Sequence, residues 1–564
     1  MKQLYTRWGK TMDRENVLGE YPRPLLERES YVNLNGEWEY AITDTIKEPG
    51  QYDGSILVPF SPESVLSGVK RQLAPDQFLW YRRNVHLEKA QGERIILHFG
   101  AVDQACKVWV NGREVFRHVG GYLPFEVDIT KEAVDGENVL SVLVQDFSDT
   151  SWHSRGKQKL RRGGMFYTAQ SGIWQTVWLE YVPEQYVREI ITAPLYDEGA
   201  VSIKVQANVL SRIKIQIDGE EAVEAFSQEE VRIPLKNLHP WTPETPFLYQ
   251  FSIEMGEDLV KSYFALRKFS VEKDEKGVVR LCLNHQPYYQ KGILDQGYWP
   301  DGLYTAPADE AMIFDIKEMK KMGFNMIRKH LKIEPQRWYY HCDRLGMIVW
   351  QDMVNGGTAY KHWFVTYAAT FLSRCRIRIP DGLSFLMSRS DKSGRREYMF
   401  ELEETIHRLY SHPSICTWVL FNEGWGQFNA QDMTELARRL DRGRLIDQAS
   451  GWFDQGGGDI VSIHNYFFRL NIHREEKRAA VLSEFGGFSM RVKEHSTGRK
   501  VYGYRIFHAR KALNKAYRRL MDQMVRPKAA DGLCGSVYTQ LSDVEDEVNG
   551  IFTYDREIKK IDQA

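Results

Sequence analysis

Residues 415–428 read ICTWVLFNEGWGQF, and they give the first indication of how the C-terminal half of this chain folds. A short apolar run rich in branched and aromatic residues is typical of a buried strand. The run stops at Asn422-Glu423, and Gly424-Trp425-Gly426 follows. Glutamate is rarely buried without a partner, and glycine lets backbone pass close to a ligand. The stretch therefore predicts a strand that delivers an acid to a site.

Seven further runs after about residue 285 have the same strand character: YYQKGILDQ, FNMIRKH, GMIVWQDM, RLIDQASG, DIVSIHNYF, AAVLSEFGG and LCGSVYTQLSD. Helix-compatible segments lie between most of them. Strand-helix alternation is typical of a parallel sheet, and eight such units predict a (β/α)8 TIM barrel over residues 273–564. The stretch 354–398 fits no simple unit, so we expect an extended loop over the barrel mouth.

One helix of the barrel can be predicted in detail. DEAMIFDIKEMKKMGFN places Met312, Ile316 and Met319 on one helical face, has acids in its first turn, and reaches Gly323 at its end. These features predict an amphipathic helix that stops at this glycine.

The first third of the chain has the pattern of β-structure. ERIILHFGAVDQACKVWVNGREVF alternates apolar and polar residues around Asn111-Gly112, which predicts a two-residue hairpin. LNGEWEYAI predicts a similar turn at Asn35-Gly36, and SGIWQTVWLEYV has the pattern of a closing strand. We expect a jelly-roll β-sandwich over residues 1–182 and, from the short strands that follow, an immunoglobulin-like β-sandwich over residues 183–272.

Composition limits the function classes. The 564 residues are too many for one core, and 75 basic against 76 acidic residues give a net charge of −1. Neither nucleic acid nor a membrane surface is indicated as a partner. No apolar run approaches the length of a membrane span, and the N-terminus lacks the apolar core of a signal peptide, so we expect a cytoplasmic protein. The six cysteines form no CxxC pair, which favours reduced, buried thiols.

Ionisable residues stand at the ends of the predicted barrel strands. Barrel enzymes place reactive side chains there, on the face built from the βα loops. Each residue alone could be a solvated strand end or a structural ion pair, but the group indicates an active site. The set is Asp295, Arg328, His330, Asp352, Glu423, His464 and Glu484.

Glu423 and Glu484 are the strongest candidates for a catalytic pair. Both follow short apolar runs, both precede glycine within two residues, and they end the fourth and seventh predicted strands. Two carboxyls facing each other across a barrel mouth suit glycoside hydrolysis. Two unrelated glutamates bonded to arginine or backbone would give the same pattern.

The sequence resembles glycoside hydrolase family 2, the family of β-galactosidases, β-glucuronidases and β-mannosidases. The resemblance covers nearly the whole chain and rests on LNGEWEY, WYRRNVHL, LHFGAVDQACKVWVNG, SGIWQTVWLE, Asn422-Glu423 and LSEFGG. It implies that Glu423 is the general acid/base and Glu484 the nucleophile, with retention at the anomeric carbon. It also implies that Asn422 hydrogen-bonds the sugar 2-hydroxyl, although a strand-end cap is an alternative.

Other residues have two interpretations each. His464 could bond the sugar, orient Glu484, or be a buried histidine satisfied by backbone. Tyr466 could hold the nucleophile through its hydroxyl or simply pack, and Arg328 could pair with the nucleophile carboxylate. Contacts to the sugar are also expected from Asp295, His330 and Asp352, although Asp352 could instead cap the next loop. Candidate stacking platforms, any one of which is more often a core residue than a ligand contact, are Trp425, Trp363, Trp452 and Trp299.

The sequence motifs do not identify the terminal sugar of the substrate. Many β-galactosidases and β-glucuronidases carry a histidine together with an acid after the first barrel strand. This chain has Leu294-Asp295-Gln296 at that place. The chain also contains no Asn-x-Lys, which in β-glucuronidases clamps the sugar carboxylate.

We therefore expect an exo-acting retaining β-glycosidase with a carbohydrate substrate and with neither cofactor nor catalytic metal; a homo-oligomer is compatible with the sequence. A carbohydrate-binding protein without catalysis is the alternative. A metallohydrolase would need clustered metal ligands, such as a His-x-His at a strand end, and the sequence contains no His-x-His.

Overall fold

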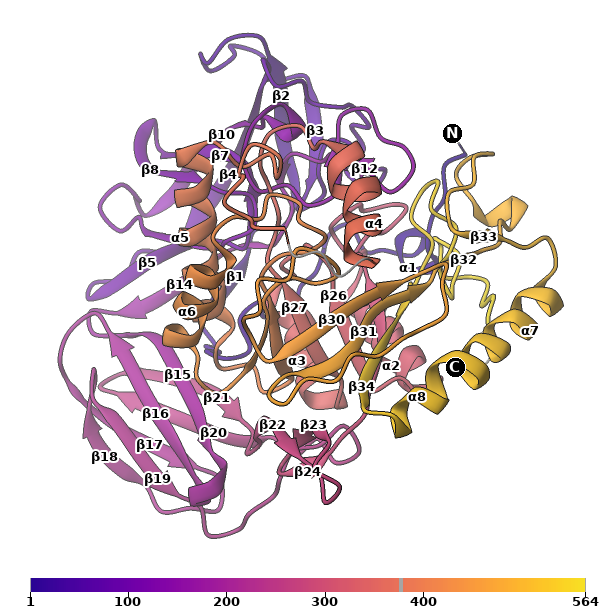
Figure 1. Cartoon of the computed structure of the whole chain (residues 1–564). Coiled ribbons are helices and arrows are strands. Elements are labelled where there is room, and N and C mark those ends of the chain that lie inside the picture. The colour runs from indigo at the N-terminus through magenta and orange to yellow at the C-terminus, as the bar shows by residue number, and fades with distance from the viewer. Residues whose placement is uncertain (1, 375–378, 563–564) are drawn as a thin grey trace.

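The computed structural model describes residues 2–374 and 379–562, and its strands form three units (Figure 1). The N-terminal unit is drawn in indigo and purple, the second in magenta, and the C-terminal unit in pink through orange to yellow. No helix in the described ranges is both long and apolar enough to cross a membrane.

The N-terminal unit is a sandwich of two antiparallel sheets whose facing apolar side chains form one core. The six-stranded sheet has the order β3 (Gly54–Val58), β2 (Gly36–Thr43), β4 (Phe78–Leu87), β10 (Gly136–Gln145), β7 (Ala105–Val110), β8 (Arg113–Val119). The four-stranded sheet has the order β1 (Tyr31–Asn33), β14 (Val177–Pro183), β5 (Glu93–Phe99), β9 (Phe125–Asp128). The predicted two-sheet architecture is confirmed.

The hairpin predicted at Asn111-Gly112 is confirmed. These two residues join β7 to β8 with φ of 51° and 78°, the left-handed values that a two-residue turn requires. The turn predicted at Asn35-Gly36 is wrong. Here β1 pairs with β14 while β2 pairs with β3 and β4, so the chain crosses from one sheet to the other at this point.

The second unit is also a two-sheet sandwich. Its three-stranded sheet contains β15 (Val187–Leu195), β16 (Ala200–Ala207) and β19 (Glu230–Pro234). Its four-stranded sheet has the order β18 (Val223–Phe226), β17 (Arg212–Ile217), β20 (Tyr249–Met255), β21 (Asp258–Phe264).

The C-terminal unit is the predicted parallel barrel, with all eight strands in the predicted segments. In chain order they are β25 (Gln290–Asp295), β26 (Met326–Lys329), β27 (Ile348–Asp352), β28 (Ile415–Val419), β29 (Leu445–Asp447), β30 (Ile460–Asn465), β31 (Ala479–Gly486) and β34 (Leu533–Thr539). Backbone pairing runs β29-β28-β27-β26-β25-β34-β31-β30, so β29 and β30 are the two ends of the sheet.

A seam therefore lies between β29 and β30, where no backbone ladder closes the barrel. One backbone bond, from the Asp459 amide to the Ile446 carbonyl at 2.8 Å, and several side chains bridge it. The Ser462 hydroxyl on β30 donates to Asp447 Oδ2 on β29 at 2.8 Å, and it lies 3.1 Å from Ser450 Oγ.

Helices cover part of the barrel. They are α2 (Asp309–Lys321), α3 (Gln336–Leu345), α5 (Lys392–Leu409), α6 (Ala430–Leu440), α7 (Arg510–Leu520) and α8 (Arg526–Ala530). The predicted helix is α2, which ends just before Gly323 and buries Met312, Ile316 and Met319. The connections β29–β30 and β30–β31, both wholly within the described ranges, contain no helix.

The stretch expected to be an extended loop contains helical structure. It holds η3 (Trp363–Ala368) and α4 (Ala369–Arg374), and α5 begins inside it at Lys392. Tyr360, Phe364 and Met387 of this segment pack against Trp425 at the barrel mouth.

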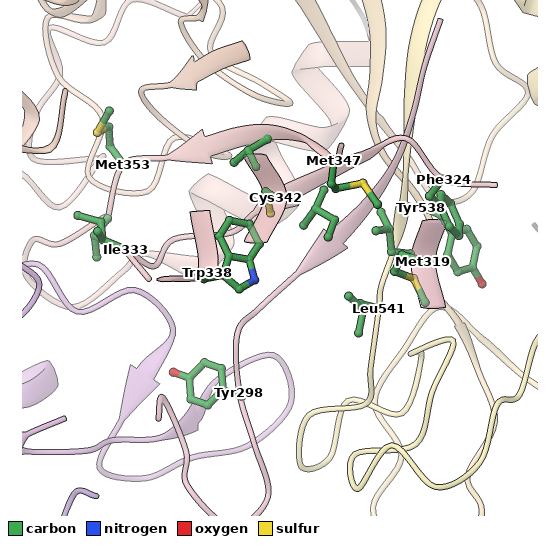
Figure 2. Close-up of a cluster of buried hydrophobic side chains, with 14 of the residues drawn as sticks. Tyr298, Met319, Phe324, Ile333, Trp338, Cys342, Met347, Met353, Tyr538 and Leu541 are labelled. Atoms are coloured by element: carbon green, nitrogen blue, oxygen red, sulfur yellow. The ribbon is translucent and has the colours of Figure 1, made fainter. Parts of the chain in front are cut away.

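Two apolar clusters hold the barrel. One contains residues from all eight barrel strands, together with Phe269, Leu281 and Leu283. These three residues belong to a small sheet of β22 (Phe269–Lys273), β23 (Val279–Leu283) and β24 (Gln286–Pro287), which packs against the strand cluster and was not predicted. The other cluster binds helices to strands, and Figure 2 shows part of it, including Trp338 and Cys342 of α3. The five cysteines in the described ranges are free and buried, as predicted; Cys375 lies outside these ranges.

A buried arginine joins the two sandwiches. Arg28 donates to Glu180 Oε2 on β14 at 2.9 Å and to both carboxylate oxygens of Asp258 on β21 at 2.8 Å. It also donates to the Val187 carbonyl. One guanidinium thus neutralises two buried carboxylates from different units.

We predict that Arg28→Ala lowers the free energy of unfolding of the N-terminal half by about 3 kcal/mol, because buried Asp258 loses its cationic partner and Glu180 keeps only Arg23 of its two arginines. Urea denaturation followed by fluorescence measures this change. Arg82→Ala is the matched control, because Arg82 pairs with Glu39 on the exposed surface and should contribute about 0.5 kcal/mol. Equal losses in the two variants would contradict the prediction.

Candidate active site

A small cavity opens among the loops that follow the barrel strands. It is lined by acids, tyrosines and one lysine, and two of its lining residues come from the N-terminal sandwich. The lining consists of Lys157, Met165, Leu294, His330, Asn422, Glu423, Trp425, Tyr466, Glu484, Tyr502, Tyr504, Thr539 and Glu547.

Glu423 follows β28 in a constrained turn. Its φ of 51° is uncommon for a residue with a side chain and costs of order 1 kcal/mol. Gly424 and Gly426 have φ of 71° and 72°. A Cβ at Gly424 would lie 2.3 Å from the Phe453 ring, and one at Gly426 would lie 2.2 Å from the Gly356 carbonyl oxygen. Both glycines are therefore required for the turn that presents Glu423.

Glu484 lies in β31 and pairs in register with His464 of β30, next to an irregularity in the ladder. One carboxylate oxygen of Glu423, one of Glu484 and one ring nitrogen of His464 all lie within 4.8 Å of one another. The two glutamates predicted to face each other across the mouth therefore do so.

The surroundings of Glu484 favour its ionised form. Tyr466 donates its hydroxyl to Oε2 at 2.6 Å, and Arg328 donates to Oε1 at 3.2 Å. Burial alone would raise the pKa of Glu484, but its interactions with His464 and Arg328 outweigh burial and lower the pKa to about 2. Glu484 is thus a carboxylate at neutral pH.

His464 connects the two acids. Its Nδ1 lies 2.9 Å from Glu423 Oε1, and its Nε2 lies 2.9 Å from Ser450 Oγ and 3.7 Å from Glu484 Oε1. The side chain is fully buried. This arrangement fixes the orientation of the Glu423 carboxyl.

Arg328 organises the floor of the site. It binds both oxygens of Asp352, at 2.9 and 3.0 Å, and donates to Asn422 Oδ1 at 2.9 Å. Because the Asn422 oxygen is occupied, its NH2 group is left to donate to a ligand. His330 lines the cavity, and its Nδ1 lies 2.7 Å from Asp352 Oδ2. Burial, reinforced by the charge of Lys157, lowers the pKa of His330 well below its ordinary value.

Two predicted sugar contacts lie behind this layer. Asp295 is bound by the Lys329 ammonium and by the Gly297 amide, and Asp352 is bound by Arg328 and His330. Neither belongs to the residues that line the cavity. Their direct contact with a sugar stays a prediction.

The four tryptophans are placed differently. Trp425 lines the cavity and stacks on Phe166 of the sandwich, with ring centroids 5.3 Å apart. Trp452 packs edge-on against His464, Trp299 is buried against Trp8, and Trp363 is exposed on η3.

Several lining residues were not singled out in the sequence. Tyr502 and Tyr504 come from the β31–β34 connection, and Tyr504 stacks on Tyr466 with centroids 3.7 Å apart. Lys157 comes from the sandwich segment KQKLRRGG. The only sequence signal was this basic run before two glycines, which marks a loop and says nothing of where the loop lies.

The two sandwiches, the barrel and the paired carboxyls at its mouth define a multidomain barrel protein with an acidic site. Three family models match: the sugar binding domain of Glycosyl hydrolases family 2 at residues 44–183, Glycosyl hydrolases family 2 at 190–267, and the family's TIM barrel domain at 279–482. The chain belongs to glycosyl hydrolases family 2.

The individual relatives have low sequence identity to this chain. The chain is 26% identical over 443 residues to a beta-galactosidase of Vibrio vulnificus, a match that covers 73% of this chain and 38% of that protein. A putative beta-glucuronidase of Formosa agariphila is 24% identical over 473 residues, covering 73% and 50%. The chain thus spans well under two thirds of the length of these relatives.

Solved structures share the whole fold. A beta-glucuronidase from an uncultured Clostridium sp. has a TM-score of 0.73 at 19% identity, covering 96% of this chain and 97% of that one. A beta-galacturonidase from Eisenbergiella tayi bound to galacturonate has a TM-score of 0.71 at 18% identity, with the same coverage.

Tyr466→Phe should lower kcat/KM on an aryl β-glycoside by about 10-fold to 100-fold, because Glu484 loses a short hydrogen bond to its charged form. Loss of that bond also raises the pKa of Glu484. More of the variant is then protonated at strongly acidic pH, so the ratio of parent to variant activity should be larger at pH 3.5 than at pH 7. Measuring kcat/KM across this range tests both points.

Tyr517→Phe is the control for this variant. Tyr517 is buried on α7, and its hydroxyl has no hydrogen-bond partner in the described part of the chain. A pH profile that is the same shape in Tyr466→Phe and the parent would show that this hydroxyl does not act on the nucleophile.

Proposed function

We propose that this protein is an exo-acting, retaining β-glycosidase that hydrolyses terminal β-linked sugars by double displacement. Glu484 is assigned as the nucleophile and Glu423 as the general acid/base. Asn422, His330, Tyr466 and Trp425 would surround the sugar.

The first half of the reaction forms a covalent intermediate. The Glu484 carboxylate attacks the anomeric carbon, and the bond between that carbon and the leaving-group oxygen breaks. Glu423 gives its proton to this oxygen, so the aglycone leaves as a neutral alcohol. The low pKa of Glu484 keeps the nucleophile ionised, while Glu423 is held in place by His464.

The second half restores the enzyme. Glu423, now a carboxylate, takes a proton from a water that attacks the anomeric carbon from the face that the aglycone left. The bond to Glu484 breaks, and the sugar leaves with its original anomeric configuration. Asn422 would contribute through its NH2 group, because a hydrogen bond to the sugar 2-hydroxyl strengthens as charge develops at the neighbouring carbon.

The spacing of the two carboxyls carries the proposal. Their nearest oxygens lie within 4.8 Å, close to the roughly 5 Å of retaining glycosidases and too short for the intervening water of an inverting mechanism.

The relatives support the reaction class. The relatives named above are a β-galactosidase, β-glucuronidases and a β-galacturonidase, all of which act on β-linked sugars. Their names differ in the sugar, so they do not assign it here.

The test is hydrolysis of a panel of aryl β-glycosides by the parent, Glu484→Ala and Glu423→Ala. We expect each variant to lose at least about 10³-fold in kcat on the best substrate. A 2-deoxy-2-fluoro glycoside of that substrate should label the peptide that contains Glu484, as mass spectrometry would show. Proton NMR should detect the β-anomer as the first product.

Glu435→Ala is the matched control, because Glu435 is exposed on α6, in the same βα unit as Glu423. Full activity in both active-site variants would refute the assigned roles. Sugar binding without turnover across the panel would favour a non-catalytic carbohydrate-binding protein.

A further inference from the structure

One cation in the cavity comes from outside the barrel. Lys157 precedes β11 (Gln158–Lys159), which pairs with β12 (Tyr167–Thr168) in a short ribbon of the N-terminal sandwich. This lysine lines the same cavity as Glu423 and Glu484.

The backbone before Lys157 is pinned to the barrel. The amides of Arg155 and Gly156 donate to the Asn355 carbonyl at 3.0 and 3.1 Å. Gly156 has φ of 61°, and a Cβ there would lie 2.8 Å from the Leu331 carbonyl oxygen, so the chain passes close to the loop after β26.

The residue after Lys157 is equally fixed. Gln158 is buried; its NH2 donates to Asp103 Oδ2 at 3.2 Å and to the Tyr122 hydroxyl at 3.1 Å, and its oxygen accepts from the Gln170 amide at 2.8 Å. The start of the Lys157 side chain is therefore set by the packing of the sandwich on the barrel.

Lys157 has no anionic partner within the described ranges. Its Nζ makes neither a hydrogen bond nor an ion pair there, and it lies 5.9 Å from the centroid of the Tyr167 ring. By contrast, the nearby barrel lysine Lys329 is paired with Asp295 and Glu334, and Lys332 with Glu334.

The acids of the cavity each have other donors. Glu484 is held by Arg328 and Tyr466, and Glu423 by His464. Glu547 accepts from the Tyr167 hydroxyl and from the Asn549 amide group. None of them needs Lys157 at ion-pair distance, so its charge is available to a ligand.

We propose that Lys157 binds a carboxylate on the sugar, and that the preferred substrates are therefore β-uronides, whose sixth carbon is a carboxylate. The inference rests on the proposed glycosidase function and adds the substrate class. The cation would come from the sandwich, which fits the lack of an Asn-x-Lys in the chain. A neutral sugar would leave this ammonium group without a counter-charge in a small cavity, and charge-assisted contacts are the strongest available there.

The test compares matched substrate pairs that differ only at the sixth carbon: aryl β-glucuronide against β-glucoside, and aryl β-galacturonide against β-galactoside. In at least one pair, the parent should prefer the uronide by about 100-fold in kcat/KM. Lys157→Gln should reduce that preference to less than about 5-fold, and Lys157→Arg should retain most of it.

Arg161→Gln is the matched control. Arg161 is an exposed cation on the same loop that does not line the cavity, so its loss should leave the preference unchanged. The thermal unfolding midpoint of each variant shows that it is folded.

A binding measurement separates this inference from the proposed function. Calorimetry on the Glu484→Gln variant, with and without Lys157→Gln, would compare glucuronate and galacturonate with glucose and galactose. Tighter binding of at least one uronate than of its matched hexose, lost with Lys157→Gln, supports the inference even if no glycoside in the panel is cleaved.

Two results would overturn it. One is hydrolysis or binding in which the parent favours the neutral member of both pairs, which leaves the glycosidase proposal intact. The other is an equal loss of both members of a pair in Lys157→Gln, which would mean that Lys157 acts on Glu484 rather than on the sugar.

Discussion

The site depends on one buried guanidinium. Arg328 uses all five of its N–H groups: two reach Asp352, and the others reach Asn422, Glu484 and the Ser483 carbonyl. These partners come from the third and seventh strands of the barrel and from the turn after the fourth, while Arg328 itself is on the second. The planar fork therefore fixes Glu484 relative to Asn422. A buried ion network of this kind is often no more stable than an apolar core, so its value here is geometric.

The second constraint is that the cavity is completed by another domain. The sandwich supplies Lys157 and Met165, and its Phe166 stacks behind Trp425. Hydrogen bonds from residues 155 and 156 to the loop after β27 hold this segment in place. The shape of the cavity is thus sensitive to how the sandwich docks, although both assigned catalytic residues lie in the barrel.

The barrel strands and the strand-end acids could be predicted because a parallel strand is buried on both faces and reads as a continuous apolar run. Glu423 and Glu484 interrupt such runs, and the interruption can be seen in the sequence alone. The turn at Asn35-Gly36 was mispredicted because its outcome depends on which distant strands pair. Lys157, Tyr502 and Tyr504 carry no periodic signal, since they lie in loops whose position is set by domain packing. The small sheet of β22 to β24 was missed for the same reason: its strands are short, and their burial comes from contact with the barrel.

The seam between β29 and β30 gives the barrel a built-in weak point. Elsewhere each strand is held by a ladder of backbone bonds, but here the contact depends on one backbone bond from Asp459 to Ile446 and on the Ser462 and Ser450 hydroxyls, and neither connection of β30 contains a helix. His464, which aligns the acid, is carried on that same strand. Mild heating should therefore disturb the position of Glu423 while the other strands remain paired. Activity would then be lost at a lower temperature than the fold itself.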